Sequence, residues 1–406
     1  MHRKILALIL IIAVAAVIGY LVIQDRHKPS TPVPPQAEDR EDVDDLQRII
    51  AGMSIEEKVG QLVVVGLEGY ELDERATRLI ETYQVGGFIL FKRNIRSVDQ
   101  AINLVNALKA RNAVNKIPLF LGVDEEGGRV SRAPADFARL PTSRSIGERN
   151  DPDLALQVGK VLAQIVKAIG LNLNFAPVLD VNSNPDNPVI GDRAFGSEPQ
   201  VVSSLGIQTM KGLQAEGVIS VVKHFPGHGD TAVDSHVGLP RVDNDLERLK
   251  ALELPPFEQA IKKGADAVMI AHILLPQIDP DNPATFSPAI ITDLLRSELG
   301  FTGVVITDDL TMGAIVNNFE IGEAAVRSIK AGSDIVLVCH DYLLEEAVIK
   351  AITAAAKSGE ISEDRLNQSV YRILKLKEKY RIADEPVRAG DVEKINAEII
   401  RLQNVI

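Results

Sequence analysis

Short apolar runs rich in β-branched residues recur along the chain, and each run ends in polar residues. The stretches between them, such as residues 96–112 and 245–264, have the periodicity of amphipathic helices. Near-continuous apolar runs are typical of strands that are buried on both faces, as in a parallel sheet covered by helices. The eight predicted strands lie in residues 61–67, 85–91, 119–125, 171–181, 219–225, 266–273, 303–310 and 334–340.

Eight strands that alternate with helices over about 300 residues favour a single α/β domain, a (β/α)8 TIM-type barrel spanning residues 46–385. A doubly wound open sheet is the alternative. It is disfavoured because no glycine-rich dinucleotide-binding motif follows the first strand. Ser54 and Glu57 fit a helix capping box near the start of the folded part. Residues 386–406 are predicted to form a helical C-terminal tail.

The N-terminus is predicted to be a separate part of the chain. Residues 5–23 form an uncharged apolar run, whose helix would span about 28 Å, close to the thickness of a bilayer core. We therefore expect residues 1–27 to be a single-pass membrane anchor, with a cleaved signal segment and a secreted protein as the alternative. Residues 28–45 contain four prolines followed by acidic residues, which predicts a disordered linker. The catalytic part is expected outside the cytoplasmic membrane.

Composition narrows the range of functions. The formal net charge is −12, so a nucleic acid would be repelled, and none is expected as a partner. Apolar residues make up 46% of the chain, which is enough for a large core. The single cysteine, Cys339, cannot form an internal disulfide.

Ionisable residues gather at the predicted C-terminal ends of the strands. In a (β/α)8 barrel this end carries the chemistry, because the loops that follow all the strands meet there. One polar residue at a strand end is commonly just solvated, but a set of them converging on one rim indicates a site. The residues are Asp124, Asp180, Lys223, His224, His272, Asp308, Asp309 and His340.

The stretch "KHFPGHGDTAVDSH", residues 223–236, holds three of the seven histidines. A zinc site of the HExxH kind needs two histidines one turn apart on a helix. Pro226, Gly227 and Gly229 do not allow that helix, so no metal is expected here. The glycines could instead form a plain polar turn. We favour a catalytic loop over the barrel mouth, because a histidine can donate and accept protons at neutral pH.

This stretch resembles the signature of the β-N-acetylglucosaminidases of glycoside hydrolase family 3, in their compact single-domain form. Four further motifs agree in order: "GVDEEGGRVSR" (122–132), "PVIGDRAFG" (188–196), "GADAVMIAHILLPQIDPDNPATFSP" (264–288) and "VVITDDLTM" (304–312). The resemblance covers roughly residues 45–380. It implies a barrel without metal or organic cofactor. It also implies double-displacement hydrolysis of terminal β-linked N-acetylglucosamine with retention of configuration, on cell-wall fragments of the peptidoglycan kind.

Carried over by residue, the resemblance makes Asp308 the nucleophile and His236, paired with Asp234, the proton donor and acceptor. It also assigns five residues to binding of the sugar hydroxyls and acetamido group: Asp124, Arg132, Arg193, Lys223 and His224. Glu125 departs from the family pattern, which often has glutamine there. The expected partner is therefore a small carbohydrate, and the protein is expected to be a monomer.

The residue types agree with this chemistry independently. Glycoside cleavage needs one group to attack the anomeric carbon and one to protonate the leaving oxygen, usually two carboxylates. Here a histidine beside an aspartate would replace one of them. Three alternatives stay open: a related β-glucosidase, a phosphorylase, and a membrane-tethered protein that only binds sugar. A binding protein would not need Asp308 together with Asp234 and His236.

Overall fold

The computed structural model describes residues 44–406. The predicted anchor and most of the predicted linker lie outside these residues, so they stay predictions from the sequence. Within the described residues, no helix has both the length and the apolar character needed to cross a bilayer. Helix α2 (Asp45–Ala51) begins at the boundary between the predicted linker and the predicted catalytic domain.

Eight parallel strands close into a barrel, and neighbouring strands in the chain are neighbours in the sheet. The ring closes where β1 pairs with β8, with Val64 opposite Leu337. All eight predicted strands are therefore confirmed. Their bounds are β1 (Val63–Val65), β2 (Gly87–Leu90), β3 (Phe120–Val123), β4 (Leu173–Asn174), β5 (Ile219–Phe225), β6 (Ala267–Ile270), β7 (Val304–Asp309) and β8 (Ile335–Val338).

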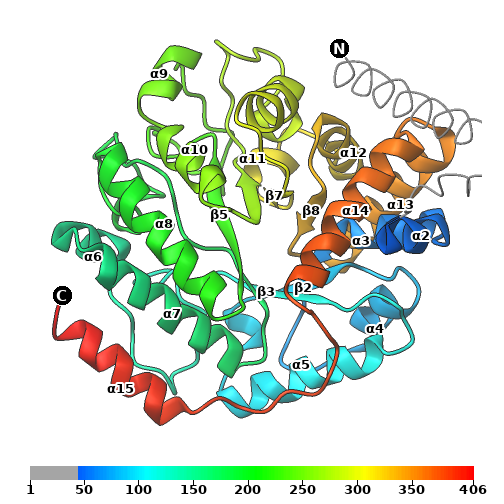
Figure 1. Ribbon diagram of the computed structural model, residues 1–406. Helices are drawn as coiled ribbons and strands as arrows, with labels where there is room; N and C mark the ends of the chain where they lie inside the picture. The colour runs from blue at the N-terminus through cyan, green and yellow to red at the C-terminus, as the bar shows by residue number, and fades with distance from the viewer. Residues whose placement is uncertain (1–43) are drawn as a thin grey trace, which may run out of the picture. The chain divides into compact units, whose positions relative to one another are not determined.

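Helices surround this barrel (Figure 1). They confirm the (β/α)8 architecture that the alternating pattern predicts. The α-helices after α2 are α3 (Ile55–Gln61), α4 (Glu74–Glu81), α5 (Val98–Asn112), α6 (Ser143–Arg149), α7 (Pro152–Ala168), α8 (Pro199–Ala215), α9 (Leu246–Ala251), α10 (Pro255–Lys262), α11 (Gly313–Val316), α12 (Ile321–Ala331), α13 (Tyr342–Ser358), α14 (Glu363–Lys379) and α15 (Val392–Gln403). Shorter helical turns are η1 (Lys92–Asn94), η2 (Gly191–Arg193) and η3 (Ala284–Phe286), and η4 (Ala289–Glu298) is a π-helix.

Local sequence signals set the starts of several helices. Ser54 accepts from the backbone N–H of Glu57, and the Glu57 side chain accepts from the N–H of Ser54, which confirms the predicted capping box of α3. Helix α7 begins with Asp151 as its cap and Pro152 in its first turn, where the missing N–H costs nothing. These caps satisfy backbone groups that the helices themselves cannot pair.

The core lies between the strands and the surrounding helices. Every residue of β5 is buried, as expected for a strand covered on both faces. Helix α15 packs against α7 and belongs to the same compact unit as the barrel, so the C-terminal segment is part of the folded body. In Figure 1, α15 lies beside α7 at the edge of the ring.

Candidate active site

A cavity of about 300 Å³ opens at the C-terminal ends of the strands. This volume is at the small end of the range for small-molecule sites. Seven of the eight residues that the sequence predicts for the site line this one cavity. They are Asp124, Arg132, Arg193, Lys223, His224, His236 and Asp308. The eighth, Asp234, does not line it but contacts His236.

The floor of the cavity is a buried charge cluster of Asp124, Glu126, Arg193 and Lys223. The Lys223 ammonium, at the end of β5, lies 2.7 Å from Asp124 Oδ1 and 2.6 Å from Glu126 Oε1. Arg193 donates to both carboxylate oxygens of Glu126, each at 2.8 Å. Lys223 thus pairs with both carboxylates and Arg193 with one of them. Such pairing offsets the free-energy cost of removing the charges from water.

Within this cluster, neighbouring charges favour the ionised forms of Glu126 and Lys223. Burial disfavours the charge on Glu126, but Arg193 and Lys223 outweigh it and keep the pKa of Glu126 well below its usual range. Burial also opposes the charge on Lys223, yet Asp124 and Glu126 raise the pKa of its ammonium. The cavity floor therefore presents fixed charges that can hold sugar hydroxyls.

His224 follows Lys223 on β5, and a buried carboxylate fixes its ring. Asp180 lies 2.7 Å from His224 Nδ1 and also accepts from the backbone N–H of His228 at 2.7 Å. This contact leaves His224 Nε2 facing the Arg193 guanidinium, 3.5 Å away. Asp180 is fully buried, so it positions His224 rather than facing a ligand.

Asp308 lies near the C-terminal end of β7 and faces the cavity. In residues 44–406 its carboxylate accepts one hydrogen bond, from the backbone N–H of Asp309 at 2.8 Å. Burial works against its charge, but His272 and His224 hold the pKa of Asp308 below its ordinary value. An ionised carboxylate with few protein partners is suited to attack an electrophilic carbon.

Asp309 has the same side chain as Asp308, but its carboxylate has different hydrogen-bond partners. Its carboxylate accepts from the N–H and hydroxyl of Thr311 and from the N–H of Cys339. These bonds tie the turn after β7 to the end of β8. The Asp309 carboxylate is therefore held by the turn, whereas the Asp308 carboxylate has fewer partners among the described residues.

His272 and His340, the other histidines at strand ends, have different surroundings. His272 is completely buried and contacts Thr285 Oγ1 (2.6 Å) and the backbone oxygen of Asp309 (2.9 Å). It supports the turn beneath Asp308. His340 is half exposed at the rim, where its ring lies 5.2 Å from the ring of Phe91.

Residues 226–240 form a loop that carries the Asp234–His236 pair, and it is named the acid–base loop after the role that the sequence predicts for this pair. Asp234 Oδ1 lies 2.7 Å from His236 Nδ1 and accepts from the backbone N–H of His236 at 2.9 Å. Partial burial opposes the charge on Asp234, but these bonds keep the pKa of its carboxyl below the usual range. The His236 side chain is 65% exposed, so its Nε2 is accessible at the cavity mouth.

His228 has a different place in the same loop. It is buried, and burial lowers the pKa of its imidazole to about 4, so the ring is neutral at neutral pH. Its nitrogens contact Thr231 Oγ1 at 2.8 Å and Ser235 Oγ at 3.1 Å. These contacts link the base of the loop to its tip, which agrees with a role in shaping the loop.

Arg132 reaches the cavity from the loop after β3. Its backbone N–H donates to the Glu125 carboxylate, which also accepts from Ser131 and Ala133. The guanidinium lies 5.9 Å from the centre of the Phe91 ring. Glu125 is thus a buried brace for this loop, and burial raises the pKa of its carboxyl.

Sequence reasoning missed Glu126, and it placed Asp180 at the rim without assigning it a role in the site. Both are buried acidic residues whose role is to hold a site residue in place. The signal for Asp180 was its position at the end of the fourth predicted strand. Glu126 follows Glu125 directly, and nothing in the sequence tells which of the two carboxylates faces the cavity.

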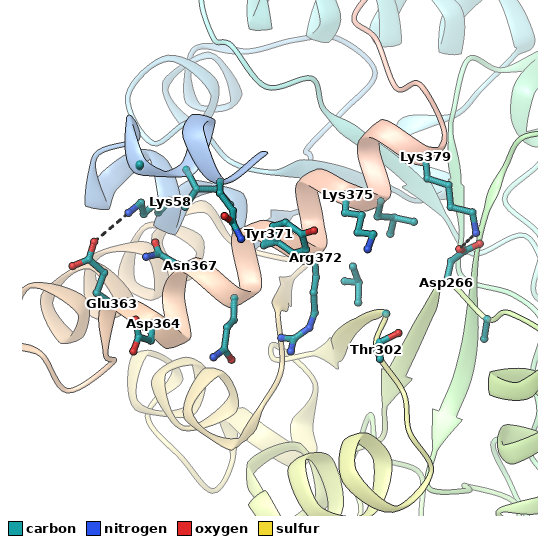
Figure 2. A pocket seen from close by; sticks show the side chains of 18 of the residues that line it. Lys58, Asp266, Thr302, Glu363, Asp364, Asn367, Tyr371, Arg372, Lys375 and Lys379 are labelled. Carbon is teal, nitrogen blue, oxygen red and sulfur yellow. Dashed lines mark hydrogen bonds and ion pairs between the residues drawn. The ribbon is translucent and has the colours of Figure 1, made fainter. Parts of the chain in front are cut away.

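A larger cavity of about 980 Å³ lies at the opposite end of the barrel, because residues 264–266 and 302–303 in its wall precede β6 and β7. Figure 2 shows Lys375 and Lys379 of α14 along one side, with Asp266 paired to Lys379. The chemistry of a (β/α)8 barrel sits at the C-terminal ends of its strands. Size alone therefore does not locate the active site here.

Residues 54–376 match the family described as "Glycosyl hydrolase family 3 N terminal domain". A "Beta-hexosaminidase" of Nitrosomonas eutropha is 39% identical over 326 residues, covering 76% of this chain and 92% of that relative. The "Beta-hexosaminidase A" of Pseudoalteromonas piscicida is also 39% identical, over 332 residues. That match covers 76% of this chain but only 56% of the Pseudoalteromonas protein.

A solved structure shares the fold closely. The glycoside hydrolase family 3 β-N-acetylglucosaminidase from Paenibacillus sp. str. FPU-7 aligns with a TM-score of 0.83 and 42% sequence identity. The alignment covers 86% of this chain and 68% of that one.

Glu126→Gln tests the buried charge cluster. Removing this carboxylate leaves Arg193 and Lys223 buried with too little negative charge, so the free energy of unfolding should fall by about 3 kcal/mol. Displacement of the two cations should also lower kcat/KM on a glycoside, by up to about 10²-fold. Denaturant unfolding and steady-state kinetics measure both effects.

Glu125→Gln is the matched control, because Glu125 is similarly buried but forms no ion pair within residues 44–406, and an amide oxygen can still accept from Ser131, Arg132 and Ala133. It should change both quantities little. Equal losses in the two variants would show that the ion pairs of Glu126 do not organise the cavity.

Proposed function

The chain belongs to glycosyl hydrolase family 3, and on that premise we propose that it is a retaining, exo-acting β-N-acetylglucosaminidase. It would release terminal β-linked N-acetylglucosamine from cell-wall fragments of the peptidoglycan kind. One observation carries the proposal: a single cavity brings together the Asp308 carboxylate and the histidine of the Asp234–His236 pair. The names of the relatives support the same activity.

The proposed binding mode places one sugar ring over the buried charge cluster. A cavity of about 300 Å³ suits a single terminal residue better than the middle of a chain, which supports exo action. Asp124 and Lys223 would hold hydroxyl groups. Glu126 fixes Arg193, and Asp180 fixes His224. These two fixed side chains would help to select the acetamido group. Because these side chains are held by ion pairs, binding would need little rearrangement.

In the first step, Asp308 attacks the anomeric carbon while His236 donates a proton from Nε2 to the departing glycosidic oxygen. The bond to the leaving sugar breaks, and a covalent glycosyl ester forms at Asp308. Asp234 orients the imidazole through Nδ1 and stabilises the imidazolium before the proton leaves.

In the second step, the neutral His236 takes a proton from water, which attacks the anomeric carbon and releases Asp308. Two inversions give net retention of configuration. The exposure of His236 suits this double role, because the same nitrogen must meet a leaving sugar and then a water molecule. No metal or cofactor is part of the proposed reaction.

Substrate selectivity tests the function itself. We expect kcat/KM for an aryl N-acetyl-β-glucosaminide to exceed that for the matching aryl β-glucoside by about 10²-fold or more, since polar groups built to bind the acetamido group are left unpaired by the glucoside. Because the two substrates have the same aryl leaving group, a difference in kcat/KM reports on recognition of the sugar. Comparable values for the two substrates would assign the protein to the β-glucosidase alternative.

The Asp234–His236 pair is tested by the dependence on leaving group. A sugar leaves poorly without a proton, whereas an acidic phenol departs without help. His236→Ala should slow glycosylation of the enzyme by about 10²- to 10⁴-fold on a disaccharide and much less on a nitrophenyl glycoside. Pre-steady-state rates measure this step directly.

Asp234→Asn should change the rates in the same direction, and the double variant should be barely worse than the worse single variant, since the two residues act as one unit. His228→Ala serves as the control for the loop and should show no dependence on leaving group. Equal losses on both substrates in His236→Ala would mean that His236 is not the general acid.

A further inference from the structure

The tip of the acid–base loop rests on the first turn of α11. The backbone N–H of Gly313 donates to the carbonyl of His236 at 3.2 Å, and the N–H of Ala314 donates to the carbonyl of Ser235 at 3.0 Å. The first N–H groups of a helix have no partner within the helix, so they are available for such bonds. The residue that carries the imidazole is thus bonded through its own backbone to α11.

Two residues of the tip are exposed to solvent. The side chains of His236 and Val237 are exposed, and Val237 as a whole is 73% exposed. Asn317, one turn further along, donates from Nδ2 to the carbonyl of Val237 at 3.2 Å. Together with the contact between Ser235 and His228 inside the loop, these bonds to α11 hold the tip in place.

Gly313 permits the contact by lacking a side chain. A Cβ atom at this position would lie 2.5 Å from the carbonyl oxygen of His236 and 2.9 Å from that of Val237. Ordinary carbon–oxygen contacts are about 3.3 Å or longer, so an alanine would push the loop tip away by roughly 1 Å. The backbone of Gly313 has no positive φ, so close approach is what requires glycine here.

The same turn is fastened to the strand that carries the nucleophile. Helix α11 begins five residues after Asp308, and the N–H of Met312 donates to the carbonyl of Asp309 at 3.0 Å. The Asp309 carboxylate fixes Thr311 and binds the end of β8 at Cys339. The turn between Asp308 and Gly313 is therefore held at both ends.

We propose that Gly313 is a positioning residue that sets the distance between the Asp308 carboxylate and the His236 imidazole. It does so by letting the acid–base loop approach α11 closely. Because α11 is fixed to β7, the loop tip is then held at a set position relative to that strand. This role rests on the proposed function, in which Asp308 attacks and His236 transfers the proton. Gly313 borders the cavity but has no side chain that could take part in the reaction.

Gly313→Ala is the direct test. A displacement of about 1 Å in the proton donor should slow glycosylation on a disaccharide by about 10- to 100-fold. Glycosylation by a dinitrophenyl glycoside should stay within about twofold of the wild-type rate, because its departure needs no proton. The loss should appear in the rate constant for glycosylation and not in the affinity for the sugar, because the cavity floor is unchanged.

Gly238→Ala is the matched control in the same loop. An added Cβ there would have a single neighbour, a methyl group of Val233 at 4.0 Å, so both rates should stay near wild type. Asn317→Ala provides a second variant on the exposed surface, in case Gly313→Ala does not fold. It removes one bond to the loop tip and should give a smaller loss, of about two- to fivefold, again only on the disaccharide.

The outcomes separate this inference from the proposed function. If His236→Ala shows the leaving-group dependence but neither Gly313→Ala nor Asn317→Ala does, the positioning role is wrong and the acid–base assignment stands. If His236→Ala itself shows no such dependence, the proposed function fails first. Equal losses of Gly313→Ala on both substrates would indicate a general structural role and would overturn the inference.

Discussion

Closure of the parallel barrel is the constraint on which the rest of the structure depends. β1 pairs in parallel with β8, as do all the other neighbouring strands. The C-terminal ends of all eight strands therefore lie at the same rim of the barrel. Residues that are far apart in the sequence, such as Asp124 on one side and Asp308 on the other, then line a single cavity. An open sheet would spread the same residues along an edge.

The two halves of the site are stabilised in opposite ways. The cavity floor is rigid, since Lys223 and Arg193 are buried against carboxylates and could not leave them without a large electrostatic cost. His236, the proposed proton-transfer group, is at the exposed tip of a loop that is bonded to α11. This division suits the proposed reaction, in which fixed charges would bind the sugar and His236 would meet first a leaving sugar and then water.

Periodicity predicted the eight strands, and the capping pattern predicted the box at Ser54, because strand burial and caps are local properties of the sequence. The seven predicted residues that line the cavity came from the resemblance to the family. The supporting contacts were not predictable in the same way. Glu126 and Glu125 are adjacent acids, yet only Glu126 pairs with the cations, and this follows from the path of the loop after β3. The contact between Gly313 and the carbonyl of His236 joins segments that are 77 positions apart and leaves no periodic signal.

The central claim is that Asp308 forms a covalent bond to the sugar. The most direct measurement uses a 5-fluoro N-acetylglucosaminyl inactivator, which slows turnover of the covalent intermediate, followed by digestion and mass analysis of the labelled peptide. One sugar per protein molecule is expected, attached to Asp308, and Asp308→Asn should not be labelled. Label on Asp309 or Asp124, or unlabelled protein that still turns over the inactivator, would contradict it.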